Sequence, residues 1–407
     1  MSFNLPADAK AAPLRIGVIG LGRAFTLMLQ TFQLDHRVQL VAATDPIEAA
    51  RRQFEKDFSA PAFDSVAAVC AHPLVEAVYI ASPHQFHAGH VGIAAAHGKH
   101  VLVEKPMALT LDECALMIEA TRRAGVRLIV GHSHSFNRPI ARTREIIESG
   151  VVGAVKMVTA FNYTDFLYRP RRPEELDTAA GGGVIYSQAA HQIDILRLLG
   201  GGLVKSVRAH VGAWDASRPT EGAYSALLAF ENGAFASATY SGYGHFDSDE
   251  LMANIGEMGQ GKNPADYGVA RRRLAGAGSA ADEAAMKAAR NYGGVAYVPA
   301  GAPVTAFSHQ HFGHIVVSCE KADLKPDATS VTIYADDQKT VESLPPPLIP
   351  RVEVIDELIA AVVHGHPTLH SGEWARATLA VSLGILQSAR AGREIQPAFQ
   401  VGLPGFA

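Results

Sequence analysis

The sequence predicts an α/β protein of two domains: an N-terminal doubly wound parallel sheet, then an α+β domain with a large, mostly antiparallel open sheet. Through about residue 133, short apolar runs alternate with amphipathic helical segments, as in successive β-α-β units. After about residue 150 the apolar runs lengthen, alternate with polar residues and meet at hairpin turns. Because 407 residues are many for one core, we place the first domain at 1–133 and the second at 134–407.

The bulk composition is that of an ordinary globular protein, with 48% hydrophobic and 19% charged residues. The net charge of −4 gives no reason to expect nucleic acid or a membrane surface as a partner. The first dozen residues lack an apolar signal core, and no apolar run is long enough to span a bilayer. Cys70, Cys114 and Cys319 are odd in number and widely spaced, which argues against a disulfide framework. We therefore expect a cytoplasmic protein.

The first predicted strand leads into a glycine turn. Residues 14–20 (LRIGVIG) are apolar, and Gly20 and Gly22 stand just before a helical segment. Strand, Gly-x-Gly and helix form the fingerprint of a dinucleotide-binding Rossmann fold, in which the glycines let a pyrophosphate approach the helix N-terminus. Phe25 replaces the third glycine, so we expect the helix packing to open slightly. The predicted cofactor contacts here are Gly20, Gly22, Arg23, Ala24 and Phe25.

The second predicted strand ends in an acid. Residues 38–44 (VQLVAAT) are apolar, and Asp45 follows about twenty residues after the glycines. A carboxylate at this position accepts hydrogen bonds from a ribose diol and repels a 2′-phosphate, so NAD is favoured over NADP. Arg51 and Arg52 could relax that preference, but we interpret them as a solvated helix face.

Two further strands end in polar residues at the same edge. Residues 76–83 (EAVYIASP) and 100–106 (HVLVEKP) each form a buried run stopped by a proline. The carboxyl ends of parallel strands meet where open α/β sheets bind ligands. We expect cofactor contacts from Ser82, Pro83, His84, His87, Glu104 and Lys105.

The second half predicts a helix and several strands. The helical segment 184–201 places Ser187 and His191 four residues apart on one face, with Asp194 one turn further on. Residues 245–305 interrupt the strand pattern and form an insertion. Two final helices, which could pack back on the first domain, are expected at about 351–363 and 373–391. The strand candidates are 152–166, 203–214, 223–233, 234–244, 311–320 and 330–337.

Together these segments resemble the glucose–fructose oxidoreductase, inositol dehydrogenase and rhizopine-catabolism (Gfo/Idh/MocA) family. The resemblance implies a Rossmann domain followed by an open sheet, with the active site between them. It also implies a pyridine-nucleotide oxidoreductase that assembles through the open sheet face, as a homodimer or homotetramer. The matching pieces are IGVIGLGRAF, Asp45-Pro46, SPHQFH (82–87), VEKP (103–106), GGGVIYSQAAHQID (181–194) and SARAGREI (388–395).

The chain departs from the family pattern in ways that bear on its substrate. Ser187 stands where sugar and inositol dehydrogenases have an acid, and Ala189 where they have a glycine. The missing acid puts a polyol substrate in doubt. Within the family, GLGRAFTLML and residues 168–197 look most like phthalate 4,5-cis-dihydrodiol dehydrogenases of aromatic catabolism. This resemblance implies oxidation of phthalate 4,5-cis-dihydrodiol to 4,5-dihydroxyphthalate with NAD.

Two residues are candidates for the proton chemistry. Lys105 would lie beside a cationic nicotinamide, and a neighbouring positive charge lowers the pKa of an amine. His191 titrates near neutral pH, which suits a base or a proton shuttle. Either could be the general base, and Tyr186 and Ser187 could orient His191. Aromatisation of the product would draw the reaction forward, so a site that lacks the usual acid could suffice.

A phthalate-derived substrate carries two carboxylates and needs cations. Guanidinium groups bind carboxylates through paired hydrogen bonds, although a solvated loop explains any single arginine equally well. His132 and His134 follow a sheet strand and are candidates for polar contacts. The predicted substrate contacts are His132, His134, Arg138, Tyr163, Arg169, Arg171, Arg172, Tyr186, Ser187 and His191.

Three alternatives stay open at this point. His132 and His134, with the later His309, His311 and His314, could bind a metal, but no nearby Cys or acid completes the set, so we expect none. A sugar or inositol-type dehydrogenase would share the fold. A catalytically silent NAD-binding regulator would be expected to lack Lys105 or His191, and both are present.

Overall fold

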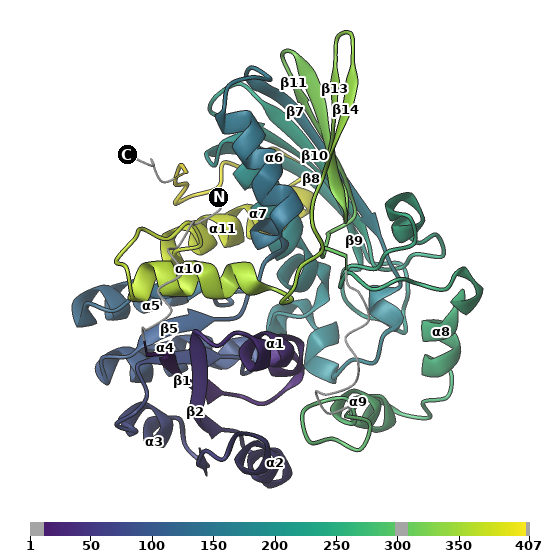
Figure 1. The fold of residues 1–407 in the computed structure, drawn as a ribbon. Coiled ribbons are helices and arrows are strands. Elements are labelled where there is room, and N and C mark those ends of the chain that lie inside the picture. The colour runs from purple at the N-terminus through teal and green to yellow at the C-terminus, as the bar shows by residue number, and fades with distance from the viewer. Residues whose placement is uncertain (1–11, 298–307, 404–407) are drawn as a thin grey trace.

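The computed structural model describes residues 12–297 and 308–403. Its first sheet has six parallel strands in the order β3-β2-β1-β4-β5-β6. This is the doubly wound arrangement that the β-α-β pattern predicts, and Figure 1 shows it in purple and blue at the base of the molecule. The strands are β1 (Leu14–Ile19), β2 (Val38–Thr44), β3 (Ala62–Phe63), β4 (Ala77–Ile80), β5 (His100–Val103) and β6 (Leu128–Val130).

Helices cover both faces of this sheet. Apolar residues of α1 and α2 pack on one face, and those of α3, α4 and α5 pack on the other. The α5 helix shows how local sequence sets the bounds: Thr110 and Glu113 form a capping box at its start, and Gly125 ends it in the left-handed conformation. The helices are α1 (Arg23–Leu34), α2 (Glu48–Phe58), α3 (Val66–Ala71), α4 (His87–Ala96) and α5 (Leu111–Ala124).

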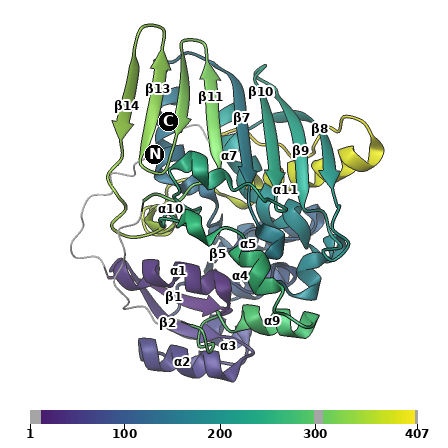
Figure 2. The same ribbon diagram turned by 90° about the vertical axis from the view of Figure 1, so that its right-hand side faces the viewer.

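The second sheet has eight strands in the order β14-β13-β12-β11-β7-β10-β9-β8. Its neighbours are antiparallel except β7 and β10, which run parallel, and the expected hairpin joins β9 to β10. The mostly antiparallel open sheet is thus confirmed (Figure 2). The strands are β7 (Val155–Tyr163), β8 (Val204–Gly212), β9 (Ala223–Phe230), β10 (Phe235–Ser241), β11 (His314–Cys319), β12 (Ala322–Pro326), β13 (Ser330–Ala335) and β14 (Lys339–Ser343).

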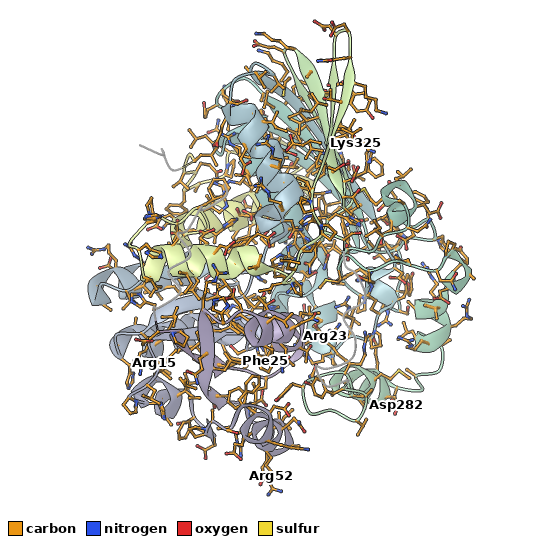
Figure 3. The ribbon with its side chains drawn as sticks, in the orientation of Figure 1. Arg15, Arg23, Phe25, Arg52, Asp282 and Lys325 are labelled. Carbon is orange, nitrogen blue, oxygen red and sulfur yellow. The ribbon has the colours of Figure 1, made fainter. Side chains whose placement is uncertain are left out.

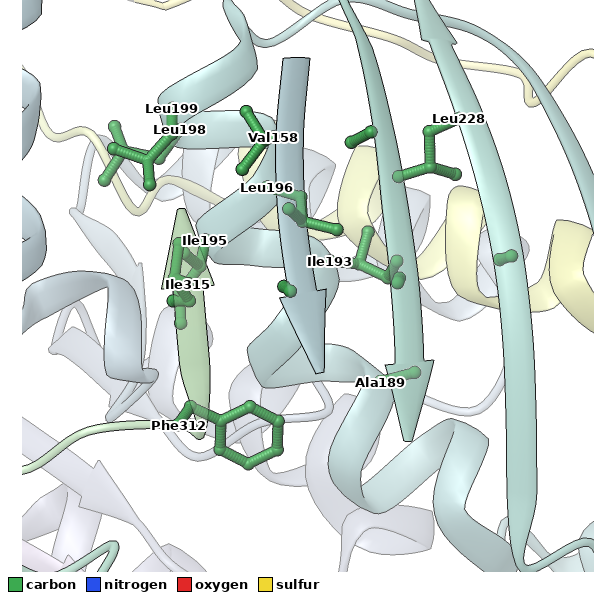
Figure 4. Close-up of a cluster of buried hydrophobic side chains, with 14 of the residues drawn as sticks. Val158, Ala189, Ile193, Ile195, Leu196, Leu198, Leu199, Leu228, Phe312 and Ile315 are labelled. Carbon is green, nitrogen blue, oxygen red and sulfur yellow. The ribbon is translucent and has the colours of Figure 1, made fainter. Parts of the chain in front are cut away.

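One face of the second sheet is covered by helices α6 (Arg138–Glu148), α7 (Ala190–Gly200) and α11 (Gly372–Ala391). Alternate strand residues such as Val158 and Leu228 face Ile193 and Leu196 of α7 in the main core of this domain (Figure 4). The helix α10 (Val352–Val362) packs instead on the core of the first domain, together with α1. The end of the chain therefore joins the two domains. The division at residue 133 stays a prediction.

The described part of the insertion between β10 and β11 includes the α-helices α8 (Val269–Leu274) and α9 (Ala280–Ala288). It leaves the second sheet and returns to the first domain beside α2, as both views show (Figures 1 and 2). Tyr292 meets Phe25 edge-on at 5.0 Å between ring centroids, and its hydroxyl donates to Asp57 at 2.6 Å. Phe25, fully buried, thus serves as a docking point for the insertion. Within the described residues, none of the helices has the length and apolar character needed to cross a membrane.

Candidate active site

The glycine turn between β1 and α1 has the shape that a dinucleotide requires. Gly20 has a φ of +95°, and a Cβ there would stand 2.7 Å from the backbone nitrogen of Ser82, so only glycine fits. A Cβ on Gly22 would meet nothing within 4 Å, which leaves open space over the turn. No side chain caps α1, whose first residues are Arg23 and Ala24, so its N-terminal N–H groups remain available to an anion. The turn therefore fits a cofactor pyrophosphate.

Asp45 fixes this turn from the end of β2. Its Oδ2 accepts a hydrogen bond from the N–H of Leu21 at 2.7 Å, and its Oδ1 accepts from Ile47 at 2.8 Å. Each carboxylate oxygen keeps a further lone pair for a ribose hydroxyl. Arg51 differs from the solvated face we expected, because it donates to the carbonyl of Asp45 at 2.7 Å. Arg52 is exposed and pairs with a glutamate on its own helix, as expected.

The residues after β4 divide into two kinds. Ser82 and Pro83 follow the strand directly beside the glycine turn, and His84 lies against Gly181 of the second domain. His87 is buried, with Nε2 2.9 Å from the carbonyl oxygen of Ser82 and Nδ1 3.1 Å from that of Pro106. Burial lowers the pKa of His87 to about 4. The predicted cofactor contact from His87 is therefore wrong: both ring nitrogens face backbone carbonyl oxygens, and the neutral ring donates a hydrogen bond to one of them.

Glu104 and Lys105 follow β5 and take different positions. The Tyr79 hydroxyl donates to buried Glu104 at 2.7 Å, and burial raises the pKa of this carboxyl. Lys105 Nζ donates to the carbonyl oxygen of Ser187 at 3.0 Å, across the gap between the domains. Burial lowers the pKa of Lys105 to about 8, although the nearby Glu104 opposes the shift. A substantial fraction of this amine is thus neutral near physiological pH.

The histidines predicted for the cleft form one cluster. The His191 ring lies 4.7 Å from His134 and 5.1 Å from Phe312, and His134 lies 5.3 Å from His132. His132 Nε2 donates to Asn137 Oδ1 at 3.0 Å, and the amide of Asn137 donates to His134 Nδ1 at 2.8 Å. Burial and the neighbouring Lys105 hold the pKa of His191 well below its usual range. The cluster is therefore neutral, and the buried Nδ1 of His191 has no partner within the described ranges.

The segment before His191 differs from the predicted regular helix. Ile185–Ala189 form one turn of π-helix, and α7 begins only at Ala190. The Ser187 hydroxyl donates to the carbonyl of Gly183, and the Tyr186 hydroxyl donates to that of Leu109 at 3.1 Å. The expectation that these hydroxyls orient His191 is therefore wrong.

Asp194 also points away from the predicted face. Its carboxylate accepts hydrogen bonds from Trp374 Nε1 at 2.5 Å and from Thr378 Oγ1 at 3.1 Å, both on α11. The hydroxyl of Ser135, after β6, donates to the same carboxylate. This side chain fixes the helices behind the cleft.

A cavity of about 570 Å³ opens between helix α1, the arginine-rich segment after β7 and the insertion. Asp165 holds Arg169 at 2.9 Å, Asp249 holds Lys262 at 2.9 Å, and Glu175 pairs with Lys287. In the described part of the chain, Arg23, Arg171, Arg273 and Arg290 form no ion pair. The surplus of positive charge marks a site for anions. The charged lining residues are Arg23, Asp165, Arg169, Arg171, Asp249, Glu257, Lys262, Arg273, Lys287 and Arg290.

The structure brings only some predicted substrate residues to this cavity. Arg169 and Arg171 line it, whereas Arg172 turns to Glu174 at 3.1 Å. Arg138 forms an ion pair with Glu145 at 2.5 Å on α6, so its predicted role in substrate binding is wrong.

The prediction for Tyr163 is wrong as well. The residue alternates along β7 with the core-facing Ala160 and Asn162, so its side chain lies on the open face of the sheet. There it lies near Phe246, at 6.0 Å between ring centroids.

The sequence analysis did not identify several residues of the site, because their partners are distant in the sequence. Arg351 follows a proline-rich segment and lies near enough to Glu104 and Lys105 to affect the pKa of both. Glu257 and Arg290 come from the insertion, whose position no local pattern gives. The arginine run 271–273 was a visible signal, and Arg273 does line the cavity.

The later histidines considered for a metal have other partners. His309 Nε2 is 2.8 Å from the carbonyl oxygen of Pro345, and His311 Nε2 is 2.8 Å from that of Ile255. The His314 ring lies near Phe161, at 5.2 Å between ring centroids, on the sheet face opposite α7. Across residues 12–297 and 308–403, no group of three potential ligands is placed to hold a metal ion.

The chain belongs to the Gfo/Idh/MocA oxidoreductase family. Residues 14–132 match the family model described as "Oxidoreductase family, NAD-binding Rossmann fold", and residues 140–260 match the "GFO/IDH/MocA C-terminal domain". The sequence-based resemblance is thereby confirmed. The protein is an NAD-dependent oxidoreductase, with the glycine turn and Asp45 in its NAD-binding domain.

The chain is also similar to individual members of this family. The chain is 50% identical over 378 residues, 93% of its length and 95% of the relative's, to a 1-carboxy-3-chloro-3,4-dihydroxycyclohexa-1,5-diene dehydrogenase from Comamonas testosteroni. It is 30% identical to a myo-inositol 2-dehydrogenase from Thermotoga maritima over 48% of this chain and 57% of that one. A solved structure described as a dehydrogenase from Bordetella bronchiseptica RB50 has 42% identity and a TM-score of 0.88, covering 94% of this chain and all of that one.

Proposed function

We propose that the protein oxidises a cis-dihydrodiol that carries a ring carboxylate to the corresponding catechol, with NAD as the hydride acceptor. The observation that carries this proposal is Arg171, which lines the cavity with its Nε buried and without a partner in the described structure. Arg171 and Glu257 of the cavity wall are close enough to influence the pKa of Lys105, so the anion site adjoins the candidate base. The carboxylated dihydrodiol in the name of the Comamonas testosteroni relative agrees with such a site.

Lys105 is the proposed general base. The bound cofactor supplies a nicotinamide ring that accepts the hydride from the alcohol carbon. Lys105 takes the proton of the hydroxyl group, because its lowered pKa leaves part of the amine free at neutral pH and its Nζ is held by the Ser187 carbonyl. The hydroxy-ketone then loses a ring proton, gains one on oxygen and becomes a catechol.

His191 is proposed to orient the substrate rather than to accept the proton. Its pKa lies well below the usual range, so the ring is neutral and a weak base. Its buried Nδ1 has no partner in the described structure, and we assign this nitrogen to the second hydroxyl of a diol, which would have to reach it from the cleft.

Arg171 is the proposed main contact of the substrate carboxylate. Its guanidinium stacks on Phe166 at 3.6 Å and one of its nitrogens donates to the Phe166 carbonyl, which fixes its position. Its Nε is buried without a partner in the described structure. Arg169 lies beside it but is already engaged by Asp165. Phthalate 4,5-cis-dihydrodiol, with two carboxylates, is our specific substrate candidate.

Initial rates of NADH formation with a substrate panel test the proposal. We expect turnover of phthalate 4,5-cis-dihydrodiol or of a monocarboxylated cis-dihydrodiol. The same ring without a carboxylate should have a kcat/KM lower by about tenfold or more, the effect of one lost charged contact. Turnover of myo-inositol or glucose in preference to every dihydrodiol would establish the polyol alternative and contradict our proposal.

We also propose that the protein assembles as a homodimer or homotetramer through the open face of the second sheet. The helices α6, α7 and α11 leave this face uncovered (Figure 1). Leu227 and Val341 on it are 53% and 57% exposed. Apolar side chains spread over an uncovered sheet favour association with a second copy.

A further inference from the structure

The insertion is fastened to the cofactor-binding half of the molecule. Tyr292 packs against Phe25 and donates to Asp57, and Gly293 lies so close to α2 that a Cβ there would touch the Ala49 carbonyl at 3.4 Å. Phe25 belongs to the first turn of α1, directly after the glycine turn. The segment that ends at Tyr292 is thereby held next to the place where a dinucleotide pyrophosphate approaches the protein.

Arg290 precedes Tyr292 by two residues and faces Arg23 within the cavity. Both side chains are accessible to solvent there. Arg23 donates a hydrogen bond to the hydroxyl of Thr26 at 3.3 Å, and in the described ranges no carboxylate pairs with either guanidinium. Partial desolvation, and then the charges of Arg290 and Arg351, lower the pKa of Arg23 to about 10. Two like charges are thus held near each other without a counter-ion.

A like-charged pair is unfavourable unless an anion lies between its members. Arg23 is the first residue of α1, whose uncapped N–H groups also attract negative charge (Figure 3). We propose that Arg23 and Arg290 together bind the pyrophosphate of the dinucleotide, so that the insertion completes the cofactor site. A pyrophosphate with two negative charges matches two guanidinium groups, which bind phosphate oxygens through paired hydrogen bonds.

Equilibrium binding tests this assignment without any turnover. The dissociation constants of NADH, ADP-ribose and adenosine are measured by calorimetry or fluorescence titration for the wild type, Arg290→Ala and Arg290→Lys. Arg290→Ala should raise the dissociation constants of NADH and ADP-ribose about tenfold or more. The dissociation constant of adenosine should change by less than about twofold, because adenosine has no phosphate. The dissociation constants of NADH and ADP-ribose for Arg290→Lys should lie between those of the wild type and Arg290→Ala. Lysine keeps the positive charge but lacks the planar guanidinium group that forms paired hydrogen bonds.

Two controls separate this role from damage to the insertion. Arg272→Ala removes an exposed arginine of the same segment, one that donates to the Tyr267 carbonyl and does not line the cavity, and should bind all three ligands normally. Tyr292→Phe removes the bond to Asp57 but keeps Arg290, so it should bind ADP-ribose better than Arg290→Ala does. Normal ADP-ribose binding by Arg290→Ala, or an equal loss for adenosine, would overturn the proposal. So would an increase confined to the KM of the organic substrate.

Discussion

Lys105 carries the proton chemistry in our account, and its environment explains why a lysine can do so. The side chain leaves the end of β5 and meets the Ser187 carbonyl of the other domain, so it lies in the gap between them. Burial lowers its pKa to about 8, while Glu104 limits the shift. His191 has a pKa well below its usual range and does not compete for the proton.

The pH dependence of kcat/KM should therefore report Lys105. We expect kcat/KM to rise about tenfold per pH unit below pH 8 and to level off above it, because the deprotonated amine is the active form. Lys105→Met should lower kcat by about 10²-fold or more and abolish the rise of kcat/KM below pH 8. The NADH dissociation constant should change little. The control is Lys99→Met, whose side chain bonds the Val75 carbonyl away from the cleft. If the rise of kcat/KM with pH persists in Lys105→Met and is absent in His191→Asn, the general base is His191.

Arg171 makes a separate prediction about substrate binding. Arg171→Ala should raise the KM of a carboxylated dihydrodiol about 10- to 100-fold, because a desolvated charged hydrogen bond is lost. Arg172→Ala is the matched control, since Arg172 is held by Glu174 outside the cavity. Initial rates over a range of substrate concentrations give both values. An unchanged KM in Arg171→Ala would remove this residue from the substrate site.

At the scale of the elements, helix α7 links the cleft to the rest of the fold. Its N-terminal end places His191 beside His134, and one turn later Asp194 turns to α11 and to the loop after β6. The hydrogen bonds from Trp374 and Thr378 are made to a buried carboxylate. These hydrogen bonds thereby fix the position of α7 relative to the cleft.

Asp194→Asn should therefore act on stability. Asparagine keeps an oxygen for Trp374 and Thr378, which both donate to Oδ1, but its amide nitrogen cannot accept the hydrogen bond that Ser135 donates to Oδ2. We therefore expect a loss of about 1–3 kcal/mol in the free energy of unfolding. Urea denaturation measures it, with the exposed Asp323→Asn as the control. If Asp194→Asn is as stable as the control, the network does not hold α7 in place.

The helices and strands also show which features of the fold and the site could be predicted from the sequence alone. Strand ends were predictable because apolar runs and prolines are local signals, and these placed Gly20, Asp45 and Lys105 at one edge. Side-chain direction was not predictable in the same way. One turn of π-helix rotates Ser187 relative to His191, and Arg138 meets Glu145 two turns further along its own helix. Distant partners such as Arg290 depend on how the insertion folds back.

At the scale of the whole molecule, the described residues form two sheets, and the insertion extends from the second sheet to the first domain (Figure 1). The last helices hold this arrangement, since α10 packs on the first core and α11 contacts both halves.

Leu227→Asp tests the assembly at this scale. A charge in the middle of the open face should raise the dissociation constant of the assembly about tenfold or more, because an unpaired charge must be desolvated at the interface. Light scattering after gel filtration measures the mass. The control is Leu116→Asp, a residue of α5 that is 68% exposed on the first domain. A wild-type protein that runs as a monomer at all concentrations would contradict the assembly.

The most direct test of the central claim follows both products of one reaction. The purified enzyme is given a limiting amount of phthalate 4,5-cis-dihydrodiol and excess NAD, and NADH and catechol are measured by absorbance and chromatography. Our account predicts one NADH and one 4,5-dihydroxyphthalate per dihydrodiol consumed, with the rate reduced at least about 10²-fold in Lys105→Met. Absence of both products, while myo-inositol or another polyol yields NADH, would contradict the account.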